Sequence, residues 1–193
     1  MMDYLEIEKL LIEQPEGWWE ELVKILPELE PMADTPQSPH FHAEGNVATH
    51  TRLTVEACPT DCDLDLLWAT LLHDIGKPLT TEVHEDGIHS RGHDRAGAKM
   101  GAELLGRLGM PVGRCRRITW AVRHHTFHMA WQLTSTCQAS KQHRNFVTHQ
   151  NFPLLLALLR ADSQGSLGHS GKTDAYHLYF ELWQDLTGQR EES

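Results

Sequence analysis

The chain has 193 residues, of which 40% are hydrophobic, and its 17 basic and 27 acidic side chains give a formal net charge of −10. This length fits one domain with a sizeable core, so we expect residues 1–193 to form a single domain. The acidic balance argues against non-specific nucleic-acid binding over the whole surface. No apolar run approaches the roughly 18 residues of a membrane span, which predicts that the membrane is not a partner. Without a basic and then apolar leader, the expected location is cytoplasmic.

The first 38 residues are expected to form a helical extension that ends in a loop. Apolar residues recur at helical spacing in residues 3–14 and again in residues 17–30. Three prolines among polar residues then predict a loop over residues 31–41. This loop leads directly into His42 and Asn46, which are therefore candidate substrate-binding residues at the lip of a site.

An apolar run that ends in a His-Asp pair organises the middle of the chain. One helix is predicted over residues 46–57, and a buried helix over residues 64–75 that carries His73 and Asp74 in its last turn. We expect Gly76 to take the left-handed conformation just past the helix end, with the proline two residues later preventing continuation. A buried carboxylate is costly without a partner, and a divalent cation is one such partner.

The rest of the pattern predicts helices and a single small hairpin. The Asp-Gly turn near residue 86 favours a β-hairpin in residues 79–91, with His84 and His89 on this flap and not serving as ligands. Residues 127–137 look irregular. Helices are predicted over residues 92–109, 111–126, 139–149, 152–162 and 172–188. The expected fold class is all-α, a helical bundle with at most a hairpin flap, divided into a core over 39–168 and a C-terminal helix within 169–193.

Several phrases occur in the order that is typical of one family. They are His42-Ala43-Glu44-Gly45-Asn46-Val47-Ala48-Thr49-His50-Thr51, Leu71 to Pro78, Gly92-His93-Asp94-Arg95-Ala96-Gly97-Ala98, Val122-Arg123-His124-His125-Thr126 and Arg160-Ala161-Asp162-Ser163. Together they resemble the HD-domain metal-dependent phosphohydrolases, and in particular the HD domain attached to bacterial CCA-adding tRNA nucleotidyltransferases. The resemblance runs from about His42 to Gly165.

The resemblance implies a metal site with one or two divalent ions. The first ion would be held by His50, His73, Asp74 and Asp162. The second would be held by His93, His124 and His125, with Asp74 shared between the two ions. A mixed set of histidines and carboxylates suits a catalytic ion such as Mn, Fe, Ni or Mg, with Zn also compatible, whereas structural zinc usually takes cysteine and histidine.

Basic side chains near these phrases are the expected phosphate contacts. Lys77, Arg91 and Arg95 are candidate substrate-binding residues, and Lys77 and Arg95 join Asp74 as candidate catalytic residues because positive charge stabilises a phosphoryl transition state. The arginine-rich segment of residues 107–123 has two interpretations, an RNA contact or a solvated helix face.

The function implied by the resemblance is hydrolysis of a phosphomonoester or phosphodiester bond by metal-activated water. The expected substrate is a small nucleotide or an RNA or tRNA end, of the 2′,3′-cyclic phosphodiesterase or phosphatase type. Thr126 and Phe127 stand where cyclic-di-GMP phosphodiesterases continue towards Gly-Tyr-Pro, and the Glu-Asp pair of alarmone hydrolases is missing. The paired acids of a nucleotidyltransferase head are also missing, which predicts a stand-alone HD domain. The alternatives are a nucleoside triphosphate hydrolase and a non-catalytic nucleotide- or tRNA-binding module.

Overall fold

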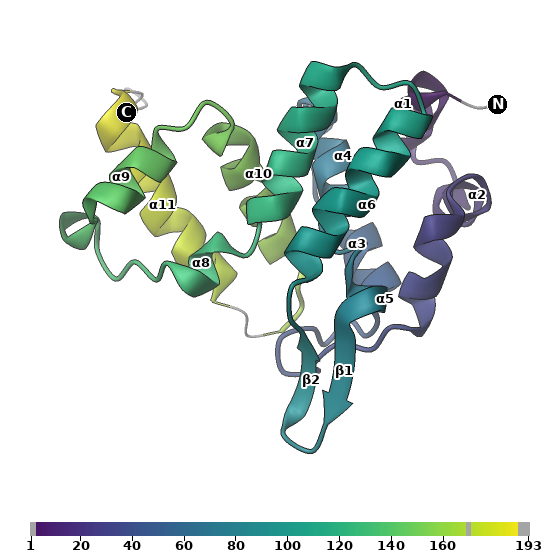
Figure 1. Ribbon diagram of the computed structural model, residues 1–193, viewed down its shortest axis with the longest axis horizontal. Helices are drawn as coiled ribbons and strands as arrows, with labels where there is room; N and C mark the ends of the chain where they lie inside the picture. The colour runs from purple at the N-terminus through teal and green to yellow at the C-terminus, as the bar shows by residue number, and fades with distance from the viewer. Residues whose placement is uncertain (1–2, 169–170, 189–193) are drawn as a thin grey trace.

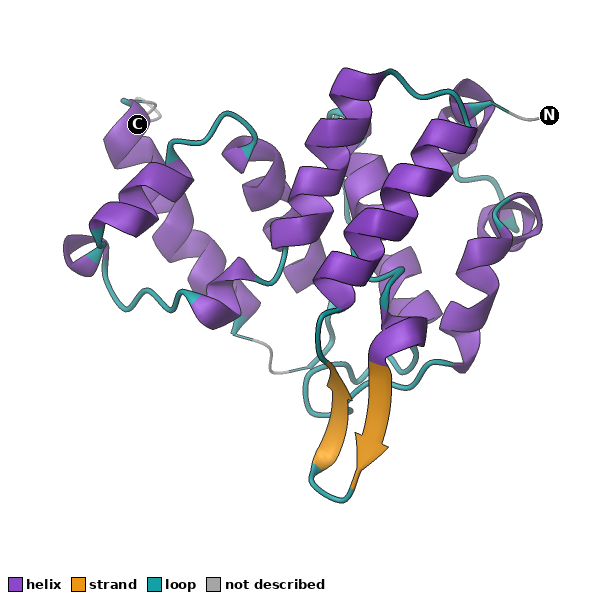
Figure 2. Ribbon diagram, in the orientation of Figure 1, coloured by secondary structure: helices purple, strands orange, loops and turns teal. Residues whose placement is uncertain are grey.

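The computed structural model describes residues 3–168 and 171–188, and in these ranges it is mostly helical with one antiparallel hairpin (Figures 1 and 2). The first helices are α1 (Tyr4–Glu13), α2 (Trp18–Ile25), the 3-10 helix η1 (Pro27–Asp34), α3 (Val47–Glu56), α4 (Leu64–Leu72) and the one-turn α5 (Lys77–Thr80). The hairpin pairs β1 (Thr81–His84) with β2 (Gly87–Ser90). The remaining helices are α6 (His93–Arg107), α7 (Val112–His124), α8 (Phe127–Ala130), η2 (Thr136–Gln138), α9 (Lys141–Val147), α10 (Phe152–Gly165) and α11 (Lys172–Thr187). The predicted all-α class is confirmed.

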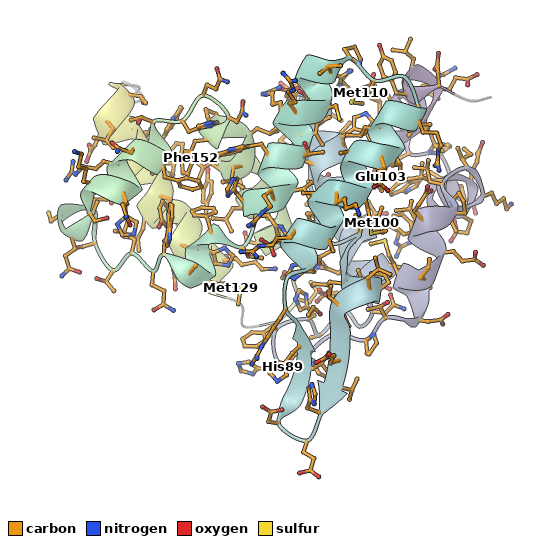
Figure 3. The ribbon with its side chains drawn as sticks, in the orientation of Figure 1. His89, Met100, Glu103, Met110, Met129 and Phe152 are labelled. Atoms are coloured by element: carbon orange, nitrogen blue, oxygen red, sulfur yellow. The ribbon has the colours of Figure 1, made fainter. Side chains whose placement is uncertain are left out.

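Helix α4 forms the centre of the molecule, because every residue from Asp65 to Leu72 is buried. Helices α3, α7 and α10 pack against it, and α6 lies alongside α7 (Figure 1). Helix α11 packs on α10, and the hairpin projects from the edge of the bundle, where His89 is seen on β2 (Figure 3). None of the helices in the described ranges is both long and apolar enough to cross a membrane.

Several element boundaries differ from the predictions. Helix α2 ends at Ile25 because the proline at position 27 has no N–H to continue the ladder, and the 3-10 helix η1 extends into the predicted loop as far as Asp34. The stretch predicted to be irregular holds α8 and η2, and helix α10 continues past the predicted end to Gly165. The hairpin forms as predicted, with Thr81 opposite Ser90.

Gly76 has a different role from the predicted one. Helix α4 already ends at Leu72, and Gly76 has φ −82°, which is right-handed. The proline at 78 does not block a helix but stands in the first turn of α5, where its missing N–H costs nothing. A Cβ atom at Gly76 would lie 2.3 Å from the carbonyl oxygen of His93 and 2.5 Å from the amide nitrogen of Gly97. Glycine is therefore needed for the close approach of α6 to the turn after α4.

Arginines of the segment 107–123 form ion pairs with acidic side chains of the same chain. Arg114 lies 2.7 Å from both Asp65 and Glu8, and Arg117 lies 2.7 Å from Asp65. Asp65 and Glu8 are buried, so these guanidinium groups balance carboxylates that would otherwise be costly. The two arginines hold α7 against α4 and α1, and this role does not require RNA.

Candidate metal centre

Six side chains from five parts of the chain meet at one end of α4, and we call them the metal centre. They are His50 on α3, His73 and Asp74 in the turn after α4, His93 at the start of α6, His125 directly after α7 and Asp162 on α10. All are buried except His93, which is partly exposed. The structure thus brings together residues that lie up to 112 positions apart (162 − 50) in the sequence.

The first histidine pair in the metal centre is His50 and His73. Their Nε2 atoms lie 3.3 Å apart. The Nε2 atom of His50 is 3.0 Å from Asp162 Oδ1, and that of His73 is 3.2 Å from Asp74 Oδ2. Each of these two carboxylate oxygens lies within 3.9 Å of both Nε2 atoms.

The second pair is His93 and His125, whose Nε2 atoms lie 3.0 Å apart. These atoms are 3.4 Å and 3.6 Å from Asp74 Oδ1. Asp74 therefore presents Oδ2 to the first pair and Oδ1 to the second, which is the arrangement of a carboxylate shared between two cation sites.

The orientation of the rings shows that these residues fit a metal ion. The Nδ1 atoms of His73, His93 and His125 lie 2.6–2.7 Å from the backbone carbonyl oxygen three residues earlier. A carbonyl can only accept, so Nδ1 carries the proton and the lone pair of a neutral ring is at Nε2. In the His93 and His125 pair, two Nε2 lone pairs thus face each other at 3.0 Å, an arrangement that a cation between them would stabilise. Outer partners of this kind are what metal-binding histidines use to fix their tautomer.

Glu44 supplies the equivalent outer partner for His50. Its Oε1 atom is 2.8 Å from His50 Nδ1, and its Oε2 atom accepts the backbone N–H of Leu167 at 2.9 Å. Burial alone would raise the pKa of Glu44, but the hydrogen bonds from His50 and the Leu167 N–H lower it to about 2. Glu44 lies within one of the family phrases but was not predicted as a site residue, and only its position beside His50 reveals its role.

Changing Glu44 to glutamine is expected to weaken metal binding about 10- to 100-fold, the usual cost of losing an outer-shell partner. The amide is uncharged and has only one acceptor oxygen, so it cannot accept from both His50 Nδ1 and the Leu167 N–H. Equilibrium dialysis against Mn²⁺ measures the change. The matched control is Glu82→Gln, because Glu82 contacts His84 at 3.0 Å on the exposed hairpin. Equal Mn²⁺ affinity in the two variants would contradict the assignment.

The structure does not place His124 in the metal centre, although the sequence suggested it as a ligand. Adjacent helical residues point about 100° apart, so α7 can direct only one of two neighbouring histidines to the centre. His125 takes that position, and the His124 ring instead lies 4.6 Å from the ring of Trp120. Six of the seven predicted ligands therefore lie together in this structure, and His124 lies apart from them.

Two lysines lie against the ligand carboxylates. Lys77 Nζ is 2.7 Å from Asp74 Oδ2 and donates to Gln37 Oε1, while Lys172 Nζ is 2.6 Å from Asp162 Oδ1. Burial would raise the pKa of both aspartates, but His73 and Lys77 hold that of Asp74 well below its usual value. Lys172 and His50 do the same for Asp162. Both carboxylates are therefore ionised and suited to bind cations. Lys172 comes from the start of α11, and no local signal marked it.

Three of the remaining predicted site residues line a cavity of about 510 Å³ beside the metal centre. Lys77, His42 and Arg91 line this metal-side cavity, together with Lys172. His128 also lines it and was not selected from the sequence; burial lowers the pKa of His128 to about 4.

Two predicted substrate contacts lie elsewhere. Asn46 caps α3, since its Oδ1 accepts the N–H of Thr49 at 2.9 Å and its Nδ2 donates to the Ala33 carbonyl at 2.8 Å. Its side chain is therefore committed to the fold and is not among those that line the metal-side cavity. Arg95 lines a second, adjoining cavity instead.

Comparison with known proteins identifies the family of the chain. Residues 46–162 match the family described as HD domain. The chain is 37% identical over 153 residues to "A-adding tRNA nucleotidyltransferase" of Deinococcus radiodurans, covering 75% of this chain and 33% of that protein. It is 36% identical over 115 residues to "Multifunctional CCA protein" of Halorhodospira halophila, covering 58% of this chain and 27% of that protein. The chain thus spans about a third or less of each of these relatives. Because the family match covers more than half of the sequence and includes the metal centre, the chain belongs to the HD-domain family.

Proposed function

We propose that this chain is a metal-dependent phosphohydrolase that cleaves a phosphomonoester or phosphodiester bond of a small nucleotide or of an RNA end. The observation that carries the proposal is the position of Asp74, whose two oxygens face two separate histidine pairs. The four histidines, Asp74 and Asp162 would hold one or two divalent ions. Such ions supply an activated water at neutral pH and charge stabilisation for phosphoryl oxygens.

Besides holding the ions, the protein would contribute basic side chains of the metal-side cavity that bind the phosphoryl group. Lys77 and Lys172 line it from opposite segments of the chain, one following α4 and the other opening α11. Their ammonium groups can bind a phosphoryl group and stabilise the negative charge that develops on its oxygens. Arg91 lies at the exposed edge of the same cavity, where it can attract a phosphorylated substrate.

Two features support a nucleotide or tRNA end as the substrate. The relatives named above carry tRNA nucleotidyltransferase and CCA protein in their names, and the metal-side cavity combines histidines with cations suited to phosphate. We therefore place a 2′,3′-cyclic phosphate or a terminal phosphomonoester first among the substrates.

A substrate panel tests the proposal. Bis-p-nitrophenyl phosphate, 2′,3′-cyclic AMP and nucleoside mono- and triphosphates are incubated with the protein and Mn²⁺, Ni²⁺ or Mg²⁺. Hydrolysis that requires added metal and is strongest with the cyclic nucleotide or the monophosphate is the expected result. Preference for triphosphates would instead favour a nucleoside triphosphate hydrolase. Metal binding without hydrolysis of any member would overturn the enzyme proposal in favour of a binding module.

A further inference from the structure

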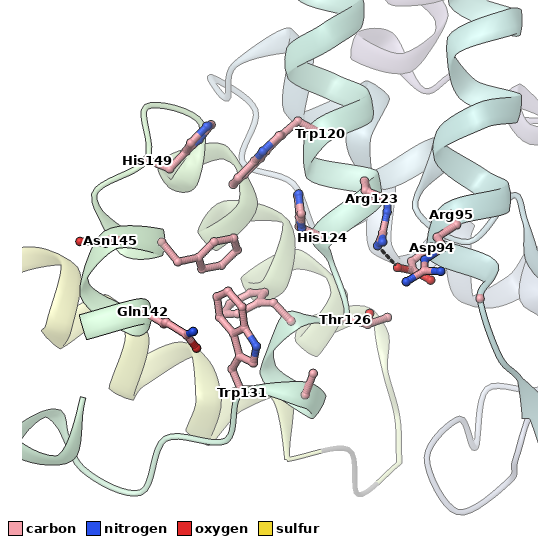
Figure 4. A pocket seen from close by; sticks show the side chains of 14 residues that line it. Asp94, Arg95, Trp120, Arg123, His124, Thr126, Trp131, Gln142, Asn145 and His149 are labelled. Atoms are coloured by element: carbon pink, nitrogen blue, oxygen red, sulfur yellow. Dashed lines mark hydrogen bonds and ion pairs between the residues drawn. The ribbon is translucent and has the colours of Figure 1, made fainter. Parts of the chain in front are cut away.

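A second cavity, of about 1040 Å³, opens next to the metal centre and is built largely of aromatic rings (Figure 4). Helices α7, α8 and α9, with the residues just after α8 and α9, supply these rings. The rings that define this aromatic cavity are Trp120, His124, Phe127, Trp131, Phe146 and His149. The function proposed above does not use any of them.

The rings pack against one another and leave the Trp131 indole accessible. Trp120 stacks on His149 at a centroid distance of 4.2 Å and an angle of 4°. Trp131 stands edge-on to Phe146 at 4.7 Å and is 36% exposed, a high value for the largest side chain. Flat rings with exposed faces are the surfaces on which proteins stack unpaired bases of single-stranded RNA.

Carboxamides complete the lining, from Gln142 and Asn145 on α9. Gln142 and Trp131 line the same cavity (Figure 4). Each carboxamide offers both donors and an acceptor, which match the hydrogen-bonding edge of a base. Both residues are exposed, so their carboxamides are available to pair with a base that enters the cavity.

The aromatic cavity adjoins the metal-side cavity. Gly92, Asp94, Thr126 and Ala130 line both of them. Two of these shared residues flank His93 in the sequence, and Thr126 follows His125. A phosphoester at the metal centre can therefore extend its nucleoside across this shared wall into the aromatic cavity.

Positive charge lies along the same path. Arg95 is exposed on the wall of the aromatic cavity, and Arg123 is held in place by its ion pair with Asp94 (Figure 4). Guanidinium groups bind phosphate in a planar, bidentate manner, so they suit the backbone of a short oligonucleotide.

We infer that the aromatic cavity binds an unpaired nucleobase next to the phosphate that is cleaved, so that the substrate is a nucleotide or a single-stranded RNA end and not a base-free phosphoester. The inference rests on the proposed function for the position of the phosphate. It also gives His124 a place, as part of the base platform and not of the metal centre.

The test is a fluorescence titration of a trinucleotide that carries 2-aminopurine, whose emission is quenched by stacking. The titration is run in EDTA, where metal-dependent hydrolysis does not occur. Trp131→Ala is expected to raise the dissociation constant about 5- to 100-fold, which corresponds to the usual contribution of one stacked base. Trp131→Phe keeps a flat ring and should restore most of the affinity. Trp19→Ala on α2, an equally drastic change far from the cavity, should bind as the wild type does.

A competition experiment identifies the base as the recognised group. AMP should displace the trinucleotide at a concentration at least about 10-fold lower than ribose 5-phosphate does. Equal competition, absence of quenching, or unchanged affinity in Trp131→Ala would overturn the inference. Quenching that depends on Trp131 supports the base site even where the substrate panel shows no hydrolysis, so failure of the base site and failure of the enzyme proposal are distinguishable. Circular dichroism melts confirm that each variant is folded.

Discussion

Replacing Asp74 with asparagine is expected to lower metal-dependent hydrolysis by more than about 100-fold. This is more than the largest usual cost of losing an outer-shell partner, because Asp74 faces the ions directly. One Asp74 oxygen lies 3.2 Å from His73 Nε2 and the other 3.4 Å from His93 Nε2, so the substitution removes the charge that both histidine pairs share and replaces the oxygen ligand of one pair. The amide is uncharged, and its nitrogen donates where a cation needs an acceptor. Metal content after dialysis and product release from the panel measure the two effects together.

The matched control is Asp86→Asn, because Asp86 pairs with His89 at 3.3 Å on the exposed hairpin. This variant should retain both metal and activity. An Asp74→Asn variant that keeps full activity would contradict the assignment of the metal centre.

His125→Ala then counts the ions, since it removes a ligand from the second pair alone. If the wild type binds two ions and the variant binds one, the protein has two sites. If both proteins bind a single ion, only the side of His50 and His73 is used.

Gly76→Ala is expected to destabilise the fold by about 3 kcal/mol, the upper part of the range for overpacking. The new Cβ would lie 2.3 Å from the His93 carbonyl oxygen and 2.5 Å from the Gly97 nitrogen, and neither backbone atom can move without shifting α6. For a chain of this size the loss corresponds to a decrease of about 6–12 °C in Tm. Because His93 opens α6, the same shift should weaken metal binding at the second pair.

Thermal denaturation with and without Mn²⁺ measures both consequences. Gly106→Ala is the matched control. Gly106 lies on α6, the helix that Gly76 contacts, and an added Cβ there would meet nothing within 4 Å. Alanine is favoured over glycine within a helix by about 1 kcal/mol, so this control should melt at or above the wild-type temperature. If Gly76→Ala melted together with Gly106→Ala, the close packing of α6 on the turn after α4 would be refuted.

Local chemistry made much of the fold predictable. Apolar residues at helical spacing predicted α3, α6, α7 and α11, and the Asp-Gly pair predicted the hairpin, because such signals act over only a few residues. The order of the His and Asp phrases predicted the family, which the match over residues 46–162 confirms. Where short-range signals were weak, as in residues 127–137, the prediction missed α8 and η2.

Contacts between distant segments account for the differences between the predicted site residues and those that the structure brings together. Choosing between His124 and His125 depends on the rotation of α7 about its axis, which is set by how α7 packs on α4 and α6. Lys172 reaches Asp162 only because α11 folds back along α10. Glu44 contacts His50 because the loop that carries Glu44 folds back against α3, the helix that carries His50.

The sequence by itself determined the all-α class, the positions of most helices, and the types of residue able to bind a divalent cation. Tertiary structure decided which histidines meet, that Asp74 faces both pairs, and that an aromatic cavity adjoins the metal centre. The physical reason is one of range. Helix formation and turns depend on neighbours within a few positions, whereas a binding site depends on the packing of elements that the sequence keeps far apart.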